Sequence, residues 1–150
     1  MKFERLNAEN VESYLDYLKI AMEQEPDMMF AEKVDEAGIR ERVADEFFQR
    51  TTSILAFDEE NIVGRIEFHF YGCMQDGYRM AYVDWIYVLK NYRHRGIAQA
   101  LFREFEKECD KHRINQYYLI TAENAEADRF YKAFHGADIK LMPILRKDFD

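Results

Sequence analysis

Cysteine, proline and glycine are all scarce in this chain of 150 residues, which contains two Cys, two Pro and six Gly. Two cysteines, Cys73 and Cys109, are too few for a disulfide framework or for a zinc site built on cysteine. We expect both to be small buried hydrophobic residues in a protein of the reducing cytoplasm. A chain of 150 residues has the usual length of one domain, and no linker interrupts the sequence, so residues 1–150 are expected to form a single domain.

Long hydrophobic runs and an excess of positive charge are also lacking. No apolar stretch approaches the ~20 residues that a membrane-spanning helix needs, and the N-terminal residues MKFERLNAEN lack the apolar run of a signal peptide. The net charge is −8, whereas nucleic-acid binding usually requires a basic face. The sequence therefore predicts no membrane and no nucleic-acid partner. Its acidity serves solubility and would also attract a cationic small molecule.

Aromatic residues, by contrast, are abundant, with 12 Phe and 10 Tyr, so much of the core should be aromatic. The spacing of hydrophobic residues predicts helices at 10–24, from Asp35 through Ile39 and Val43 to Phe47, at 97–112 and at 123–134. It predicts strands at 2–6, 53–58, 61–72, 79–88 and 115–121, with one broken strand or two over 137–149. This order indicates a mixed α/β (α+β) fold with a mostly antiparallel sheet, a central parallel β-α-β crossover and flanking helices.

One basic stretch departs from the acidic character of the chain. Residues 92–98 read YRHRGIA and lie where the apolar segment VDWIYV (83–88) runs into the helix that begins at Ile97. Unpaired N–H groups at a helix start suit phosphate, and Gly96 and Ala98 let a ligand approach the backbone closely. The cations that would add attraction for an anion are Lys90, Arg93 and Arg95. The alternative is an ordinary surface turn with solvated cations.

The segment RHRGIA resembles the R/Q-x-x-G-x-G/A motif of the GNAT superfamily of acyl-CoA-dependent N-acyltransferases. A second motif, N-x-x-A-x-x-F-Y, begins thirty residues later at Asn124 and ends at Tyr131; it resembles the helix that follows the fifth strand of that family. The order of elements also agrees, so the resemblance covers nearly the whole chain and implies a GNAT-like sheet. His94 departs from the pattern, because many members have glycine at this position.

The resemblance implies acetyl-CoA as cosubstrate and no metal. In the family, backbone N–H groups of the motif loop, here His94 to Ala98, hold the diphosphate of the coenzyme. Its pantetheine arm pairs with the fourth strand like an added strand. A backbone N–H near Val88 would stabilise the oxyanion that forms during acyl transfer. The residues implied to bind the coenzyme are Ile86, Tyr87, Val88, Arg93, His94, Arg95, Gly96, Ile97, Ala98, Asn124 and Tyr131. Asn124 is also expected to cap its helix.

The resemblance also implies a general acid. Tyr131 matches the tyrosine that protonates the leaving thiolate in the family, since a phenol with a pKa near ~10 stays protonated at neutral pH. From periodicity alone, Tyr131 would be a core residue in an aromatic stripe with Phe130 and Phe134. The sequence therefore leaves a structural alternative for this tyrosine.

A carboxylate is needed as well, because the acceptor amine must lose a proton before it attacks. Asp84 is the first candidate: it lies four residues before Val88, hence on the same face of the strand, where similar acyltransferases often carry an acid. Its alternative is a structural acid paired with an arginine or a backbone N–H. Glu67 and His69 on the preceding strand are second candidates, and solvated positions would explain both.

Together these features predict an acyltransferase that moves an acetyl group from acetyl-CoA to a primary amine of a small molecule or peptide, in a ternary complex. The acceptor pocket is expected between the first two helices, the MMF segment at 28–30 and the 72–78 hairpin, with Tyr14 and Trp85 available. A polyamine, an aminoglycoside and an amino-terminal amine remain open. The alternative is a non-catalytic acyl-CoA sensor or interaction module. The final strands, if exposed, would allow a homodimer.

Overall fold

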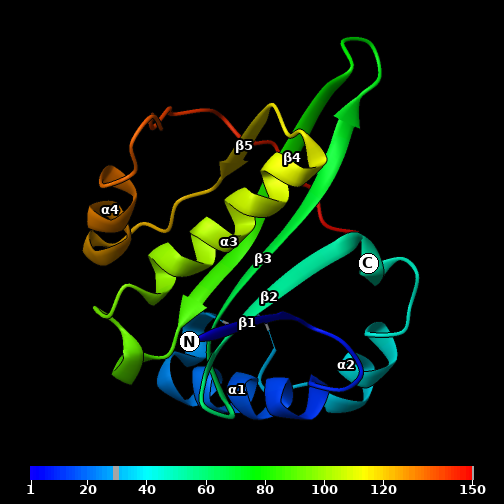
Figure 1. Ribbon diagram of the computed structural model, residues 1–150, viewed down its shortest axis with the longest axis vertical. Helices are drawn as coiled ribbons and strands as arrows, with labels where there is room; N and C mark the ends of the chain where they lie inside the picture. Colours follow the sequence, from blue (N-terminus) through cyan, green and yellow to red (C-terminus); the bar gives the residue numbers. More distant parts are fainter. Residues whose placement is uncertain (29–30, 150) are drawn as a thin grey trace. The chain divides into compact units, whose positions relative to one another are not determined.

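The described residues, 1–28 and 31–149, place five strands in one sheet (Figure 1). In this computed structural model the strands lie in sequence order: β1 (Lys2–Arg5), β2 (Thr51–Asp58), β3 (Asn61–Cys73), β4 (Tyr78–Val88) and β5 (Gln116–Leu119). The first four pair antiparallel, whereas β4 and β5 run parallel and are joined through α3 (Ile97–His112). The predicted mixed α/β fold, with a mostly antiparallel sheet and one parallel crossover, is confirmed.

The chain divides into two compact units, Met1–Leu119 and Ile120–Asp150. The first unit holds all the described strands together with α1 (Val11–Gln24), α2 (Glu36–Arg42) and α3. The second unit holds α4 (Ala125–Lys132) and a C-terminal segment. The expectation that residues 1–150 form a single domain therefore stays a prediction.

Helix α3 packs on one face of the sheet, against β2, β3 and β4 (Figure 1). Its contact is aromatic: the rings of Phe68 and Phe105 have centroids 4.7 Å apart, and both side chains are fully buried. Gly64 on β3 has no side chain to separate the layers, since a Cβ there would lie 3.2 Å from Leu101 and 3.3 Å from Ile97. The first turns of α3 therefore approach the sheet closely, beside the end of β4.

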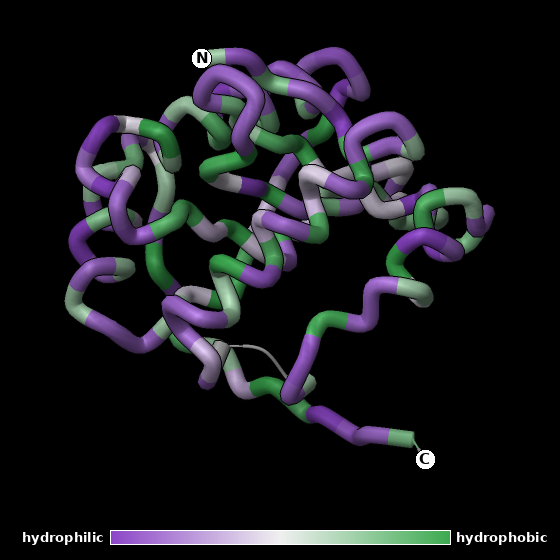
Figure 2. The backbone as a smooth tube through the Cα atoms, turned by 90° about the horizontal axis from the view of Figure 1, so that it is seen from below, coloured by the Kyte–Doolittle hydropathy of each residue, from purple (hydrophilic) through white to green (hydrophobic). Residues whose placement is uncertain are grey.

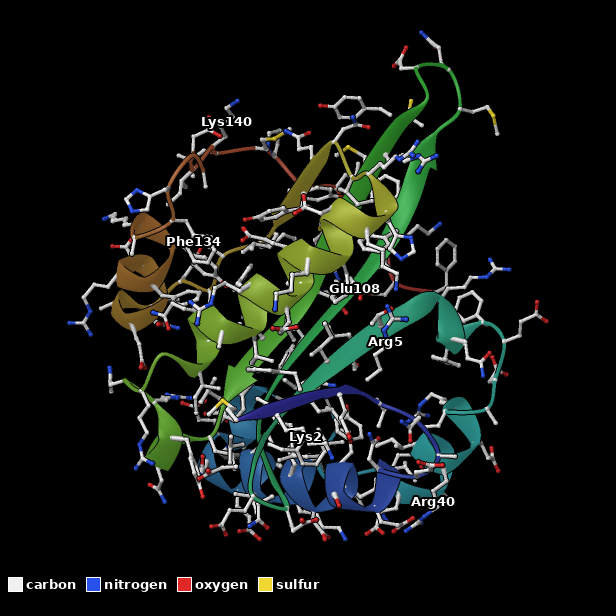
Figure 3. The ribbon with its side chains drawn as sticks, viewed as in Figure 1. Lys2, Arg5, Arg40, Glu108, Phe134 and Lys140 are labelled. Carbon is white, nitrogen blue, oxygen red and sulfur yellow. The ribbon has the colours of Figure 1, made fainter. Side chains whose placement is uncertain are left out.

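Helix α1 packs on the opposite face with its own aromatic core. Tyr17 is 2% exposed and donates a hydrogen bond from its hydroxyl to the carbonyl oxygen of Tyr87, 2.9 Å away. Burial raises the pKa of Tyr17, so its phenol stays protonated. Helix α2 is held to α1 by Arg40, labelled in Figure 3, which donates to both carboxylate oxygens of Glu12 at 2.7 and 2.9 Å. The two faces of the sheet are thus covered by different helices of the first unit.

The second helix is shorter than its hydrophobic spacing predicts. Asp35 caps it as expected, since its carboxylate accepts from the N–H of Gly38 at 3.1 Å. The helix ends at Arg42, however, and Phe47 is 71% exposed. A second carboxylate explains the stop: Asp45 accepts from the N–H of Phe47 at 2.8 Å, and such local bonds compete with helical ones.

Two other expectations are wrong. Cys109 is buried, but Cys73 is exposed near the end of β3. The final strands predicted over 137–149 are not formed, because the described part of this segment has neither helix nor strand. Hydrophobic and hydrophilic stretches both occur along it (Figure 2), but such a segment forms a strand only where an edge is available for pairing, and Pro143 offers no N–H. A homodimer was expected to form through exposed final strands, and the described residues do not form these strands.

Candidate functional site

Strands β4 and β5 separate halfway along β4. The last residues that pair across them are Val83 and Leu119, whereas β4 continues to Val88. From Asp84 onward, no strand in the described chain pairs with this edge of β4, although its other edge continues to pair with β3. The carbonyl of Val88 accepts from Arg93, and the other backbone groups that face the open edge are available to an added strand, as the predicted pantetheine pairing at 86–88 requires.

A β-bulge lies at the point of separation. Trp85 pairs with Glu67 and Val83 pairs with Phe68, so Asp84 is an extra residue that faces no partner on β3. A bulge re-aims the side chains around it and is over-represented next to active sites. Asp84, the first candidate for the base, is thus the bulged residue itself.

The bulge overturns the argument that placed Asp84 on the face of Val88. Val83 and Val88 are five residues apart, yet both pair with β3 residues that face α3. The alternation of side chains between the two faces of β4 is therefore interrupted at the bulge. The side chain of Asp84 is exposed, and its charge interacts with those of Arg65 and Tyr82. Arg65 pairs with Tyr87 and Tyr82 pairs with His69, and these pairs lie on the face of the sheet opposite α3. Asp84 consequently belongs with the α1 side of the sheet.

The start of α3 lies just beyond the end of β4. Gly96 precedes the helix with φ 76°, and His94 has φ 59°, a region in which glycine costs least. The first helical hydrogen bond runs from the N–H of Ala100 to the carbonyl of Gly96. The N–H groups ahead of it, which the helix itself cannot satisfy, are those of Ile97, Ala98 and Gln99. Nothing lies within 4 Å of the position of a Cβ at Gly96, so this side of the loop is open.

The cations of the loop have different surroundings. Arg93 donates from Nε to the carbonyl of Val88 at 3.0 Å and from Nη2 to Glu25 at 3.0 Å. Lys90 donates to the carbonyl of Gln24 at 2.7 Å. These two cations therefore hold the loop to the end of α1. Arg95 lies over the ring of Tyr92, 5.2 Å from its centroid, and no acidic side chain of the described residues pairs with it.

Glu67, the second carboxylate candidate, belongs to a hydrogen-bonded network on the α1 face. Ser53 donates from Oγ to Oε2 of Glu67 at 2.6 Å, and Arg65 donates from Nη1 to the same oxygen at 3.3 Å. Arg65 also donates to the hydroxyl of Tyr14. His69 continues this face of β3, with its ring centroid 5.5 Å from that of Tyr82. Sequence reasoning missed Arg65, although a cation inside the apolar run NIVGRIEF was the available signal.

The remaining predicted site residues belong to the second unit. Asn124 caps α4 as predicted, accepting from the N–H of Ala127 at 2.8 Å. The ring of Tyr131 lies 5.2 Å from Phe130 and 6.1 Å from Phe134, centroid to centroid. Burial raises the pKa of Tyr131, which keeps the phenol protonated at neutral pH. The aromatic stripe is therefore present, and the first unit alone brings together the bulge, the β4 edge and the motif loop.

Among the residues that the structure describes, no group of three or more His, Cys, Asp or Glu side chains is placed to hold a metal ion. No helix in the described chain has both the length and the apolarity to cross a bilayer. The donors of the site are backbone N–H groups and arginines, which suit phosphate and carbonyl oxygens.

Known proteins resemble this chain in fold. One solved structure is a ribosomal-protein-alanine N-acetyltransferase from Brucella melitensis biovar Abortus 2308, with 18% identity, a TM-score of 0.75 and coverage of 98% of this chain and 100% of that chain. Another is the aminoglycoside acetyltransferase meta-AAC0020 from an uncultured soil metagenomic sample, with 16% identity, a TM-score of 0.79 and coverage of 97% and 95%. A third is an integron cassette protein from the mobile metagenome of V. cholerae, with 14% identity, a TM-score of 0.80 and coverage of 98% and 91%.

Comparison of sequences finds fewer matches than comparison of structures. No curated protein sequence matches the chain significantly. The family model described as the acetyltransferase (GNAT) family, however, matches residues 11–137, which include the bulge, the motif loop and Tyr131. The match spans most of the chain and agrees with the observed sheet, so this protein belongs to the GNAT acetyltransferase family.

Proposed function

We propose that this protein transfers an acetyl group from acetyl-CoA to a primary amine of a small molecule or peptide, with both substrates bound at once. The observation that carries the proposal is the adjacency of two features. The unpaired edge of β4 ends at Val88, and the open helix start at Gly96 follows it within the same unit. A ligand with an anionic end and an extended amide arm matches both.

The residues present fit such a coenzyme. The N–H groups of the loop from His94 to Ala98 would hold its diphosphate, with Arg95 adding charge and Arg93 bracing the loop through Glu25. The backbone of Ile86–Val88 would pair with its amides, and a backbone N–H near Val88 would polarise the acetyl carbonyl. When bound, the coenzyme supplies the activated acetyl group as a thioester. Asn124 and Tyr131 are kept in the proposal as the further coenzyme-binding residues that the resemblance to the family implies.

The proton steps are assigned to the carboxylates and to Tyr131. An alkylammonium has a pKa near ~10, so a carboxylate on the α1 face, Asp84 or Glu67, accepts its proton and leaves a nucleophilic lone pair. The amine nitrogen then bonds to the acetyl carbon as the carbon–sulfur bond breaks. Tyr131, whose raised pKa keeps the phenol protonated until this point, gives its proton to the departing sulfur, and the second proton lost by the amine nitrogen restores the phenol directly or through water.

The acceptor is expected on the α1 side, where both carboxylates stand. Trp85 and Tyr14 belong to this side, with their rings 5.7 and 5.4 Å from the Arg65 guanidinium. Met29 and Phe30, also expected to line the pocket, lie outside the described residues. A protein amine and an aminoglycoside are the acceptors named for two structures of similar fold. Both acceptors carry amino groups, which supports the reaction class without choosing between them.

The test is release of free CoASH from acetyl-CoA, followed with a thiol reagent, across a panel of polyamines, aminoglycosides and peptides with free amino termini. We expect release that depends on one class of amine, with the acetylated product confirmed by mass. A thermal-shift screen with and without acetyl-CoA selects the amines for the panel. Stabilisation by acetyl-CoA without release for any amine would instead support the sensor or interaction module.

A further inference from the structure

A buried arginine, Arg65, lies close enough to the two candidate carboxylates to interact with their charges. Arg65 is only 7% exposed, with the rings of Tyr14 and Trp85 5.4 and 5.7 Å from its guanidinium carbon. Burial opposes the charged form, but surrounding phenols and carboxylates, Glu67 and Asp84 among them, outweigh it and raise the pKa of Arg65. Arg65 therefore carries a permanent positive charge inside the first unit.

One hydrogen-bond donor of Arg65 has no partner among the described residues, which a purely structural role does not explain. Its Nη1 donates to Tyr14 and Glu67, but its Nε is a buried nitrogen with no hydrogen-bond partner among the described residues. A buried ion pair rarely stabilises a fold more than well-packed hydrophobic residues would, and an unsatisfied donor costs further stability. The stability of the fold therefore does not account for a cation at this position.

Glu67 is held in one orientation by this arrangement. Ser53 and Arg65 both donate to Oε2, at 2.6 and 3.3 Å, whereas no hydrogen bond within the described residues reaches Oε1. The side chain is 23% exposed, so it is neither sealed from the acceptor nor freely rotating in solvent. A carboxylate fixed through one oxygen with the other open is preorganised to accept a proton.

Asp84 lacks such support. Its side chain is exposed at the bulge, and its carboxylate makes no hydrogen bond or ion pair with the residues that the structure describes. Glu67 pairs directly across the sheet with Trp85, the residue after the bulge and next to the edge at Ile86–Val88. Both acids are thus close to the expected reaction centre, but only Glu67 has its carboxylate oriented by neighbours.

We infer that Glu67 is the proton acceptor of the acetyl transfer and that Arg65 and Ser53 are its positioning residues. This inference rests on the proposed function. The N–H bond of the acceptor ammonium breaks and an O–H bond forms at Oε1, directly or through one water. The proton later passes to solvent and restores the carboxylate. Arg65 balances the charge of the ionised carboxylate, and Ser53 fixes its plane.

The test begins with Glu67→Gln, which keeps the hydrogen bond from Ser53 and removes the basic oxygen. Turnover should fall by about 10²–10⁴-fold, with the Kd for acetyl-CoA unchanged. Ser53→Ala should lower turnover about tenfold through loss of orientation. The matched controls are Glu60→Gln in the turn between β2 and β3 and Thr52→Ala beside Ser53, and both should keep wild-type turnover.

A double-mutant cycle separates positioning from mere structural support. Because Ser53 acts through Glu67, Ser53→Ala should have no further effect on turnover in the Glu67→Gln background. Arg65→Lys should retain part of the turnover that Arg65→Met loses, at equal thermal stability, since lysine keeps the charge. Ser53→Ala supplies the test of positioning if Arg65→Met does not fold.

The outcomes also separate this inference from the proposed function. If the wild type releases CoASH but Glu67→Gln does so within threefold of it, or Asp84→Asn causes the larger loss, the inference is overturned and the transferase stands. A further loss when Ser53→Ala is added to Glu67→Gln would overturn the positioning. If the wild type releases no CoASH with any amine, the proposed function fails, and the inference fails with it.

Discussion

Substitutions at Gly96 separate the backbone strain of the motif loop from its contact with the coenzyme. Gly96 has φ 76° and ψ 11°, and a Cβ there would meet no atom within 4 Å. Gly96→Ala should therefore cost only the left-handed strain, about 1 kcal/mol. Gly77, in the turn between β3 and β4, has φ 63° and equally open surroundings. Gly77→Ala is the matched control, and both variants should lower Tm by about 2–4 °C.

Gly96→Glu adds a negative charge at the point where we expect the diphosphate. Two like charges about 4 Å apart repel by about 1 kcal/mol in water and about 4 kcal/mol at the effective dielectric constant of a protein surface. An intermediate value of about 2 kcal/mol weakens binding about 30-fold. The measurement is titration calorimetry with acetyl-CoA, for the wild type, Gly96→Glu and Gly77→Ala.

Two results would refute this reasoning. If folded Gly96→Glu binds acetyl-CoA with the wild-type Kd, the diphosphate does not lie on the start of α3. If Gly77→Ala weakens binding as much as Gly96→Glu, the effect comes from loss of stability and not from the loop. Raising the salt concentration provides a further control, because it should reduce the difference between Gly96→Glu and the wild type.

Three further predictions concern the acid, the brace of the loop and the helix contact. Tyr131→Phe should lower turnover strongly and leave acetyl-CoA binding nearly unchanged; equal turnover would reject Tyr131 as the acid. Burial opposes the ionisation of Glu25, but its contact with Arg93 prevails and lowers the pKa of Glu25 below 4.5. The ion pair of Glu25 with Arg93 therefore stabilises the fold above pH 4.5, and this contribution is lost as the pH falls through the lowered pKa. Glu25→Gln should lower the free energy of unfolding in urea by about 0.5–1 kcal/mol at pH 7 and not at all at pH 2. Gly64→Ala should cost about 1–3 kcal/mol, because its Cβ would lie 3.2 Å from the buried Leu101; an unchanged Tm would show that α3 can shift.

The parts of the protein that the sequence predicted correctly depend on neighbours a few residues away. Helix α3 follows from hydrophobic residues four apart, and the caps at Asp35 and Asn124 each bond to an N–H three residues on. The motif loop is local in the same sense, since a turn with glycine before a helix exposes its N–H groups wherever it stands. These features could be read from the sequence because their partners lie in the same short window.

Tertiary structure determined what depends on segments far apart in the chain. The pairing register of β3 with β4 creates the bulge at Asp84, and no local pattern showed that an extra residue stood there. Arg93 looks like a free cation in the sequence, but its partner Glu25 is 68 residues away. Arg65 became a buried charge beneath Glu67 only when α1 folded over β3. Charge pairing and strand register depend on which surfaces meet, and that is settled only when the layers pack.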